Sequence, residues 1–306
     1  MSITSLKLPS FAKINRLLKV LGKRPDGYHE IFTVLQTISL CDELEFELRT
    51  DGRLTLVCDD PGIPTNETNL VIKAAAALQQ KLETSLGADI KLTKRIPAQG
   101  GLGGASSNAA VTLFGLSGLW RGDGHLDRLA RDLGADVPFF TSGGRCVATG
   151  IGATLHPVDD GPRQLLIIIT PNARISTPKA YAALKAGSLT TMDSMPILSS
   201  SFGRLFTNDT SQWPEPENDF ERVIFEIEPE IERAKRALLE AGVRGALLAG
   251  SGASVFGVVD DEVTRERVID NLKGEAGWQI FSCETLSRAE YSKAMKPSGF
   301  PLFTLS

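Results

Sequence analysis

The chain has 306 residues, of which 42% are hydrophobic and 23% are charged, and this composition is typical of a globular protein of about two domains. Its formal net charge of −4 leaves no overall basic surface, so nucleic acid is not expected as a partner. The chain lacks a long apolar run, and its four cysteines and three histidines are scattered. We therefore expect a cytoplasmic protein with reduced thiols, without a membrane segment, a disulfide framework or a structural zinc site.

The first half of the chain carries strand patterns and helix patterns in turn. Apolar and charged residues alternate over 44–48, and the turn signal Asp51-Gly52 separates them from a second strand pattern, which predicts an antiparallel hairpin. A long run of alanine, leucine and lysine predicts a helix. The predicted elements of residues 1–170 are strands over 44–48, 54–58, 89–94, 145–149 and 164–170 and helices over 69–86, 108–120 and 126–133.

The second half of the chain follows a predicted domain boundary near Pro157, which gives domains of residues 1–157 and 158–306. Residues 187–218 are rich in serine, threonine, methionine and proline, and we expect them to be irregular or loosely helical. The other predicted elements are helices over 179–184, 219–241 and 261–272 and strands over 245–249, 254–259 and 278–283. Helices together with a mostly antiparallel sheet predict the α+β class.

A segment rich in glycine and serine, residues 97–107, lies between a predicted strand and a predicted helix. Its four glycines let backbone N–H groups approach an anion, and the N-terminus of the next helix adds a partial positive charge. A P-loop is excluded because Gly104 is followed by Ala105 and Ser106 instead of lysine, and Ser106 would also replace the third glycine of a dinucleotide fingerprint. A glycine-rich helix entry without a ligand is the alternative to a polyphosphate site.

Three segments in the same order resemble motifs of the GHMP kinase superfamily: AKIN at 12–15, PAQGGLGGASSNAA at 97–110 and LAGSGASVF at 248–256. The resemblance implies a two-domain fold, with an N-terminal ATP-binding domain like ribosomal protein S5 and a ferredoxin-like C-terminal domain. It also implies ATP and Mg²⁺ as cofactors. The residues that it assigns to ATP are Pro97, Ala98, Gln99, Gly100, Gly101, Leu102, Gly103, Gly104, Ala105, Ser106 and Ser107.

A narrower resemblance, to the branch of this superfamily that acts on a cytidine diphosphate alcohol, lies in KRPDGYH at 23–29 and GADVP at 134–138. It implies phosphorylation of the 2-hydroxyl of a methylerythritol unit, in the non-mevalonate route to isoprenoid precursors. Asp136 would accept the hydroxyl proton, and Lys13 would stabilise the negative charge of that carboxylate. The residues that the resemblance assigns to substrate binding are Asn15, Tyr28, His29, Thr177, Tyr181, Gly250 and Ser251.

Several positions depart from the superfamily pattern or have an ordinary structural explanation. Glycine is usual at Gln99 and Ala105, so a positive φ at either position would require a local adjustment. Taken alone, Asp136 would be a turn residue and Lys13 a solvated strand lysine. For Tyr181, a buried position on the helix over 179–184 is as well supported as a place beside the base. Phe11 also replaces a usual proline, and Ala249 a usual serine or threonine.

Two other functions remain open at this level: a superfamily kinase for homoserine, mevalonate or a sugar, and a catalytically silent nucleotide-binding module. The Tyr28-His29 segment argues against the first, and Lys13 together with Asp136 argues against the second. No pair of carboxylates indicates the magnesium ligands, although Ser106 or Ser107 could supply one oxygen. We expect a monomer or a weak homodimer.

Overall fold

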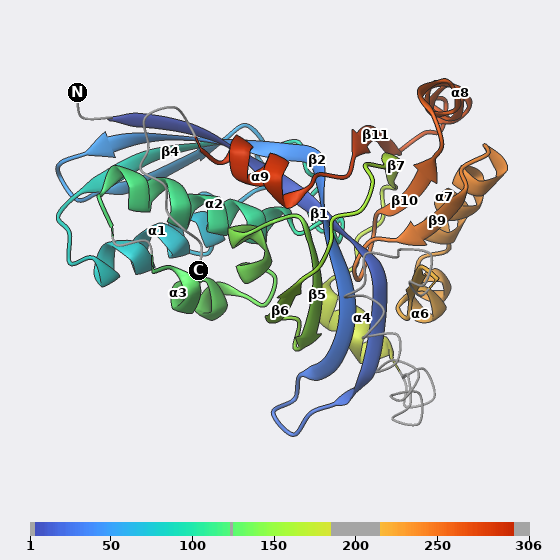
Figure 1. The fold of residues 1–306 in the computed structure, drawn as a ribbon, viewed down its shortest axis with the longest axis horizontal. Coiled ribbons are helices and arrows are strands. Elements are labelled where there is room, and N and C mark those ends of the chain that lie inside the picture. The colour runs from blue at the N-terminus through green and yellow to red at the C-terminus, as the bar shows by residue number, and fades with distance from the viewer. Residues whose placement is uncertain (1–3, 123–124, 185–214, 297–306) are drawn as a thin grey trace.

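The structure is a computed structural model, and it describes residues 4–122, 125–184 and 215–296. Two sheets lie next to each other, and the long strands β1 and β2 belong to the first of them (Figure 1). The strands are β1 (Ser5–Lys23), β2 (His29–Arg49), β3 (Leu54–Cys58), β4 (Gly87–Thr93), β5 (Arg145–Gly150), β6 (Thr154–Pro157), β7 (Leu165–Thr170), β8 (Glu217–Asn218), β9 (Gly245–Leu248), β10 (Val255–Val259) and β11 (Gln279–Glu284). The helices are α1 (Leu70–Lys81), α2 (Gly104–Leu119), α3 (Asp127–Leu133), the 3-10 helix η1 (Pro138–Thr141), α4 (Thr177–Ala183), α6 (Glu221–Ile227), α7 (Pro229–Glu240), α8 (Glu262–Leu272) and α9 (Arg288–Ala294).

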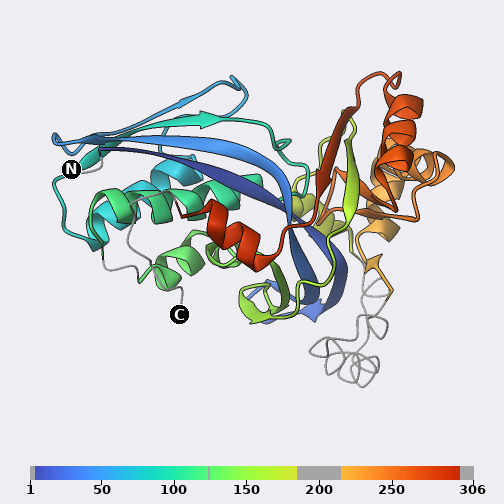
Figure 2. The same ribbon diagram turned by 45° about the horizontal axis from the view of Figure 1, so that its top comes forward.

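The N-terminal sheet has the strand order β3-β4-β2-β1-β8, with β5 paired to β2 and β6 paired to β5. Helices α1, α2 and α3 cover one face of it (Figure 2). Apolar side chains of α2 such as Leu113 and Leu116 pack against Phe46 and Ile90 of the sheet in one buried cluster. Burial of these side chains is the main favourable contribution to the stability of this half.

The predicted hairpin between 44–48 and 54–58 is wrong, although both strands exist. The turn forms, with Gly52 at φ +74°, but β3 pairs with β4 in parallel and not with β2. The reason is that both edges of this part of β2 are already occupied, by β1 on one side and β4 on the other. A parallel pair needs a crossover, and α1 supplies it between β3 and β4.

Several predicted boundaries differ from the observed ones for local reasons. The helix predicted over 69–86 is α1, which is capped by Asn69 and ends before Glu83, a residue with φ 48°. The helix predicted over 219–241 is two helices, because Pro229 lacks an N–H and starts α7. The N-terminal strand β1, the first half of β2, β6, η1 and α9 were not predicted.

The C-terminal sheet has the order β11-β7-β10-β9 and is antiparallel throughout. Its core also contains side chains of β1 and β2, namely Leu18, Val20 and Ile31. In the opposite direction, α9 leaves the C-terminal sheet and buries Tyr291 in the N-terminal cluster. These observations confirm the α+β class, whereas residues 187–214 of the segment expected to be irregular lie outside the described residues.

Within the described ranges, no helix is long and apolar enough to cross a membrane.

Candidate active site

A cavity of about 1120 Å³ lies where the two sheets meet the glycine-rich segment. Its walls come from β1, β2, the segment 97–106, the turn after α3, α4 and the turn between β9 and β10. The following residues singled out in the sequence line it: Lys13, Asn15, Tyr28, His29, Pro97, Ala98, Gln99, Gly100, Gly101, Leu102, Gly103, Gly104, Ala105, Ser106, Asp136, Thr177, Tyr181, Gly250 and Ser251. Residues that are far apart in the sequence thus share one cavity.

Lys13 and Asp136 form an ion pair at the wall of this cavity. The Nζ atom of Lys13 lies 3.7 Å from Oδ2 of Asp136. The lysine side chain is only 6% exposed, whereas that of the aspartate is 40% exposed. A buried cation next to a carboxylate that remains open to the cavity leaves an acceptor oxygen available to a bound hydroxyl group.

Asn15 connects this ion pair to the interior of the sheet. Residues 13 and 15 face the same side of β1, and the Nζ of Lys13 donates to Oδ1 of Asn15 at 2.7 Å. The amide nitrogen of Asn15 donates to Oγ1 of Thr33 at 2.8 Å, and Thr33 in turn donates to the carbonyl of Leu17 at 2.6 Å. This chain fixes the orientation of the amide and of the ammonium group. Thr33, which sequence reasoning missed, therefore contributes to the geometry at Lys13.

The glycine-rich segment enters α2 through three residues in the left-handed region. Gln99, Gly101 and Gly103 have φ of 58°, 75° and 73°. Ala105 lies inside α2 and needs no positive φ, so of the two departures from the superfamily pattern only Gln99 carries backbone strain. The first N–H groups of α2, at Gly104, Ala105 and Ser106, have no intrahelical partner, and these three residues line the cavity. With the helix dipole they form an environment suited to phosphate.

Ser107 differs from the other residues assigned to ATP. It is fully buried and does not line the cavity, and its Oγ accepts a hydrogen bond from Ser10 Oγ at 2.8 Å. The hydroxyl joins α2 to β1. Its assignment to ATP stays a prediction.

The turn between β9 and β10 packs directly against the glycine-rich segment. The backbone N–H of Ala253 donates to Gln99 O, and that of Ser254 donates to Gly100 O, each at 3.1 Å. A Cβ atom on Gly101 would lie 2.0 Å from the carbonyl oxygen of Ala249. The absence of a side chain at Gly101 is therefore required by close contact as well as by φ.

The same turn reaches the ion pair through Gly250. A Cβ on Gly250 would lie 3.2 Å from the Nζ of Lys13, and Asn218 Nδ2 donates to the carbonyl of Gly250 at 2.7 Å. Ser251 and Thr177 share a hydrogen bond of 3.0 Å between their hydroxyls. Asn218, the last residue of the segment 187–218, carried no signal in the sequence as a residue that shapes the site.

Aromatic rings line another part of the cavity. The rings of His29 and Tyr181 stack with centroids 4.7 Å apart, and Phe220 meets Tyr181 edge to face at 4.9 Å. Burial, and then the charge of Lys23, lower the pKa of His29, so its imidazole is neutral at pH 7. Burial and the nearby charge of Asp136 raise the pKa of Tyr181 to about 12. Tyr28 is 61% exposed and offers a free aromatic face.

Residues that sequence reasoning did not assign complete the lining. Lys94 brings a cation next to the N-terminus of α2, because a Cβ on Gly104 would lie 3.4 Å from its Nζ. The remaining unassigned lining includes Leu18, Ile31, Gly62, Ile63, Pro64, Asn69, Asn108, Ile151 and Phe220. Most of these residues lie in segments that carry no recognisable motif, so nothing in the sequence assigned them to a site.

The donors present suit a nucleotide better than a metal ion held by protein side chains alone. Among the described residues, no group of three or more histidine, cysteine, aspartate and glutamate side chains could hold a metal ion. Phosphate oxygens together with Asp136 or the Ser106 hydroxyl would provide the oxygen ligands that Mg²⁺ prefers. The arrangement as a whole can hold a polyphosphate at α2 and an alcohol at Asp136.

Comparison with known proteins finds matches over most of the chain. Residues 69–144 match the model of the GHMP kinases N terminal domain, and residues 198–277 match that of the GHMP kinases C terminal domain. A 4-diphosphocytidyl-2-C-methyl-D-erythritol kinase from Solibacter usitatus is 38% identical over 291 residues, covering 93% of this chain and 90% of the relative. Another of the same name, from Pseudomonas syringae, is 40% identical, covering 88% of this chain and 90% of the relative.

Solved structures give the same picture at the level of the fold. A crystal structure of 4-(cytidine 5'-diphospho)-2C-methyl-D-erythritol kinase superposes with a TM-score of 0.76 at 31% identity, covering 92% of this chain and 99% of that one. A homoserine kinase from Cytophaga hutchinsonii has a TM-score of 0.72 at 19% identity, covering 94% of this chain and 96% of that one, and it shares the fold.

Proposed function

We propose roles for the cavity residues from the premise that the chain belongs to the 4-diphosphocytidyl-2-C-methyl-D-erythritol kinases of the GHMP kinase family. The chain is an ATP-dependent small-molecule kinase that phosphorylates 4-diphosphocytidyl-2-C-methyl-D-erythritol, in the non-mevalonate pathway of isoprenoid precursor biosynthesis. The finer proposal is that the phosphate is transferred to the 2-hydroxyl group. The Lys13–Asp136 pair at the cavity wall is the observation that most directly supports phosphoryl transfer to an alcohol, and the choice of the 2-hydroxyl follows from the resemblance to the relatives.

Asp136 accepts the proton of the 2-hydroxyl while its oxygen attacks the γ-phosphorus of ATP. A bond forms between that oxygen and phosphorus, the bond from the γ-phosphorus to the β–γ bridging oxygen breaks, and ADP leaves. Because a carboxylate is a much weaker base than an alkoxide, the proton moves late, when the transition state is already loose. Lys13 lies 3.7 Å from the carboxylate and stabilises the charge that develops on the transferred oxygens.

The nucleotide phosphates lie on the segment 97–106 and the N-terminus of α2. The free N–H groups at the start of the helix and the ammonium group of Lys94 meet their negative charge. The hydroxyl of Ser106 would help to hold Mg²⁺, which would neutralise part of that charge.

The cytidine end of the substrate lies against the aromatic lining. Tyr28 or the His29–Tyr181 pair stacks on the base, and the neutral imidazole of His29 accepts a hydrogen bond from the exocyclic amino group of cytosine. Asn15 contacts the polyol. The backbone of Gly250 and the hydroxyls of Thr177 and Ser251 contact the substrate phosphates. We further propose a cytoplasmic protein that acts as a monomer or a weak homodimer.

Phosphorylation of the proposed substrate tests this assignment. The purified protein is incubated with ATP, Mg²⁺ and 4-diphosphocytidyl-2-C-methyl-D-erythritol, and the position of the new phosphate is determined by ³¹P and ¹³C NMR. We expect it at the 2-hydroxyl. Homoserine, mevalonate and a hexose are assayed in parallel, and release of ADP with one of them but not with the cytidine diphosphate alcohol would overturn the proposal.

The role of Asp136 is tested by Asp136→Asn. The amide keeps the size of the side chain but cannot take up the proton, so we expect kcat to fall by about 10²–10⁴-fold while the affinity for ATP changes little. Glu83→Gln, a control at an exposed acidic position at the end of α1, should leave kcat unchanged. An unchanged kcat for Asp136→Asn would remove this residue from the reaction.

A further inference from the structure

Asp42, near the middle of β2, is a fully buried carboxylate that accepts four hydrogen bonds. Its Oδ1 accepts from the backbone N–H groups of Arg95 at 2.7 Å and Ile96 at 2.8 Å. Its Oδ2 accepts from the Nζ of Lys94 and from Nδ2 of Asn108 at 3.1 Å. An ionised carboxylate in such a position is retained only with satisfied partners, because an unpaired buried charge is strongly destabilising.

The four donors lie at the two ends of the glycine-rich segment. Residues 94–96 come immediately before Pro97, and Asn108 comes immediately after Ser107 in the first turns of α2. One carboxylate on the central strand of the sheet therefore holds both ends of the segment that is assigned to the nucleotide phosphates. The segment between these ends contains three residues in the left-handed region, and its geometry depends on where the ends are held.

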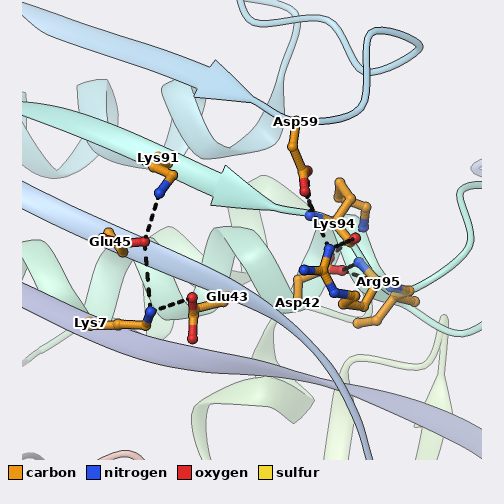
Figure 3. Close-up of polar contacts among 9 residues, drawn as sticks. Lys7, Asp42, Glu43, Glu45, Asp59, Lys91, Lys94 and Arg95 are labelled. Atoms are coloured by element: carbon orange, nitrogen blue, oxygen red, sulfur yellow. Dashed lines mark hydrogen bonds and ion pairs between the residues drawn. The ribbon is translucent and has the colours of Figure 1, made fainter.

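A second carboxylate holds the entrance to the segment from the other side. Oδ1 of Asp59, which follows β3, accepts the backbone N–H of Lys94 at 2.7 Å, and the guanidinium of Arg95 lies 3.3 Å from Oδ2 of Asp59. Figure 3 shows the backbone of residues 94–95 between Asp59 on one side and Asp42 on the other. Asp59 is nearly half exposed, so its contribution is screened by water, whereas that of Asp42 is not.

Asp42 also sets the position of a cation in the cavity. The side chain of Lys94 is 9% exposed and lines the cavity, and its Nζ lies against the first residue of α2 while it donates to Asp42. Removal of the carboxylate would free this ammonium group to leave the N-terminus of the helix. Asp42 therefore acts on both the backbone donors and the lysine that face the phosphates.

We propose that Asp42 is a positioning residue for nucleotide binding: it holds Lys94 and both ends of the segment 97–107 in the geometry that receives the phosphates of ATP. The inference rests on the proposed function in one respect, the placement of ATP at this segment. Asp42 itself does not line the cavity.

Asp42→Asn tests the proposal because it should change the KM for ATP but not the KM for the cytidine diphosphate alcohol. The amide replaces one acceptor oxygen with a donor that faces Lys94 and Asn108, so the contacts to both are lost. We expect the KM for ATP to rise about tenfold or more, as for the loss of a charge-assisted hydrogen bond, while the KM for the cytidine diphosphate alcohol stays within about twofold. The affinity for a non-hydrolysable ATP analogue, measured by calorimetry, should fall by the same factor.

A matched control is Asp160→Asn. Asp160 likewise accepts two backbone N–H groups, from Arg145 and Arg288, each at 2.8 Å, but it lies outside the cavity. This variant should lower the melting temperature without raising the KM for ATP. Asn108→Ala is a milder second variant, which removes one of the four bonds to Asp42 and should raise the KM for ATP about threefold if Asp42→Asn is insoluble.

Two outcomes would overturn the inference. The first is a lower melting temperature of Asp42→Asn with an unchanged KM for ATP, and the second is an equal rise in KM for both substrates. The wild-type protein is measured in parallel. If it binds the ATP analogue but does not phosphorylate the alcohol, the proposed function is wrong. The role of Asp42 is then decided by the affinities of the wild type and Asp42→Asn for the analogue.

Discussion

At the scale of single residues, the chemistry of the cavity depends on partners that the sequence does not place side by side. Lys13 lies on β1 and Asp136 lies in the turn between α3 and η1, yet Nζ and Oδ2 are 3.7 Å apart. Asn15 and Thr33 then fix the ammonium group through a chain of hydrogen bonds that ends on the backbone of β1. Motif resemblance could single out Lys13, Asn15 and Asp136, but Thr33 lies in a strand with no motif of its own.

Gln99 carries a measurable backbone strain. A left-handed φ of 58° costs a residue with a Cβ about 1–2 kcal/mol, whereas glycine loses only about 0.5–1 kcal/mol of entropy on folding. We expect Gln99→Gly to raise the free energy of unfolding by about 0.5–1 kcal/mol in urea titrations. Ala98→Gly is the control, because Ala98 does not have a positive φ and the substitution should destabilise. A loss of stability in Gln99→Gly would show that the side chain contributes more than the strain costs.

The protonation of His29 predicts how substrate binding depends on pH. Its pKa is lowered from 6.5, first by burial and then by Lys23, so protonation occurs below pH 6.5 and removes the acceptor nitrogen. We expect the KM for the cytidine substrate to rise as the pH falls below about 6.5, while the KM for ATP does not change with pH in this way. Because the unfolded chain takes up this proton at higher pH than the folded one, acidification through the same window also lowers stability slightly.

His29→Gln is the comparison for this profile, since glutamine retains an acceptor but does not titrate. Its KM for the cytidine substrate should stay flat over the same pH range. The same rise with acid in His29→Gln would assign the pH dependence to another group.

At the scale of elements, the glycine-rich segment is shaped by contacts on every side. It bonds to β1 through Lys13 N and Leu102 O at 2.9 Å, and to the turn between β9 and β10 through Ala253 and Ser254. Composition predicted its phosphate-binding character from the glycines and serines alone. The start of α2 at Gly104, four residues before the predicted start at 108, could not be predicted from periodicity because the first turn consists of small residues without an apolar pattern.

The close contact at Gly101 predicts that even the methyl group of alanine would disturb ATP binding and stability. A Cβ there would lie 2.0 Å from the carbonyl oxygen of Ala249, so the backbone of one segment must move. We expect Gly101→Ala to raise the KM for ATP by about an order of magnitude and to cost about 1–3 kcal/mol of stability, measured by steady-state kinetics and chemical unfolding.

Gly274→Ala is the matched control for Gly101→Ala. A Cβ at Gly274 meets no atom within 4 Å, and its φ is not positive, so activity and stability should hardly change. If Gly101→Ala changed activity and stability as little as this control, the glycine-rich segment and the turn between β9 and β10 would not be in fixed contact.

At the scale of the whole molecule, the two sheets are joined by more than the chain connection. One buried cluster contains Ile14 and Ile38 from the N-terminal sheet together with Ile168 and Phe256 from the C-terminal sheet. Helix α9 belongs to the last part of the sequence but packs in the N-terminal cluster, where the hydroxyl of Tyr291 donates to the carbonyl of Phe140. The boundary between residues 157 and 158 stays a prediction.

The packing of Tyr291 predicts that the C-terminal helix stabilises the N-terminal half. Its side chain is 2% exposed and its ring lies 5.6 Å from that of Phe11. We expect Tyr291→Ala to lower the free energy of unfolding by about 3–5 kcal/mol, as for other large cavities, in thermal and chemical unfolding. Tyr291→Phe, which loses only the hydrogen bond, should cost about 1–2 kcal/mol. Equal effects of the two variants would contradict a packing role for the ring.

Much of the secondary structure followed from local patterns, because alternation and helical periodicity report directly which face of an element is buried. The strands over 54–58, 145–149 and 164–170 and the helix over 126–133 were close to the observed elements. The pairing partner of the strand over 54–58 could not be predicted locally, because it depends on which distant strand still has a free edge. Beta strand β1 was missed because it is buried along most of its length and does not alternate.

The sequence by itself determined the α+β class and the family, since each depends on residue types in a fixed local order, and the binding of phosphate by the segment 97–107 stays a prediction from the same pattern. Only the tertiary structure decided which side chains meet: the contact of Lys13 with Asp136, the support from Thr33, and the fixing of both ends of the glycine-rich segment by Asp42. The physical reason is that hydrogen bonds and ion pairs act over a few ångströms in space, and residues far apart in the sequence reach that distance only after the sheets have packed.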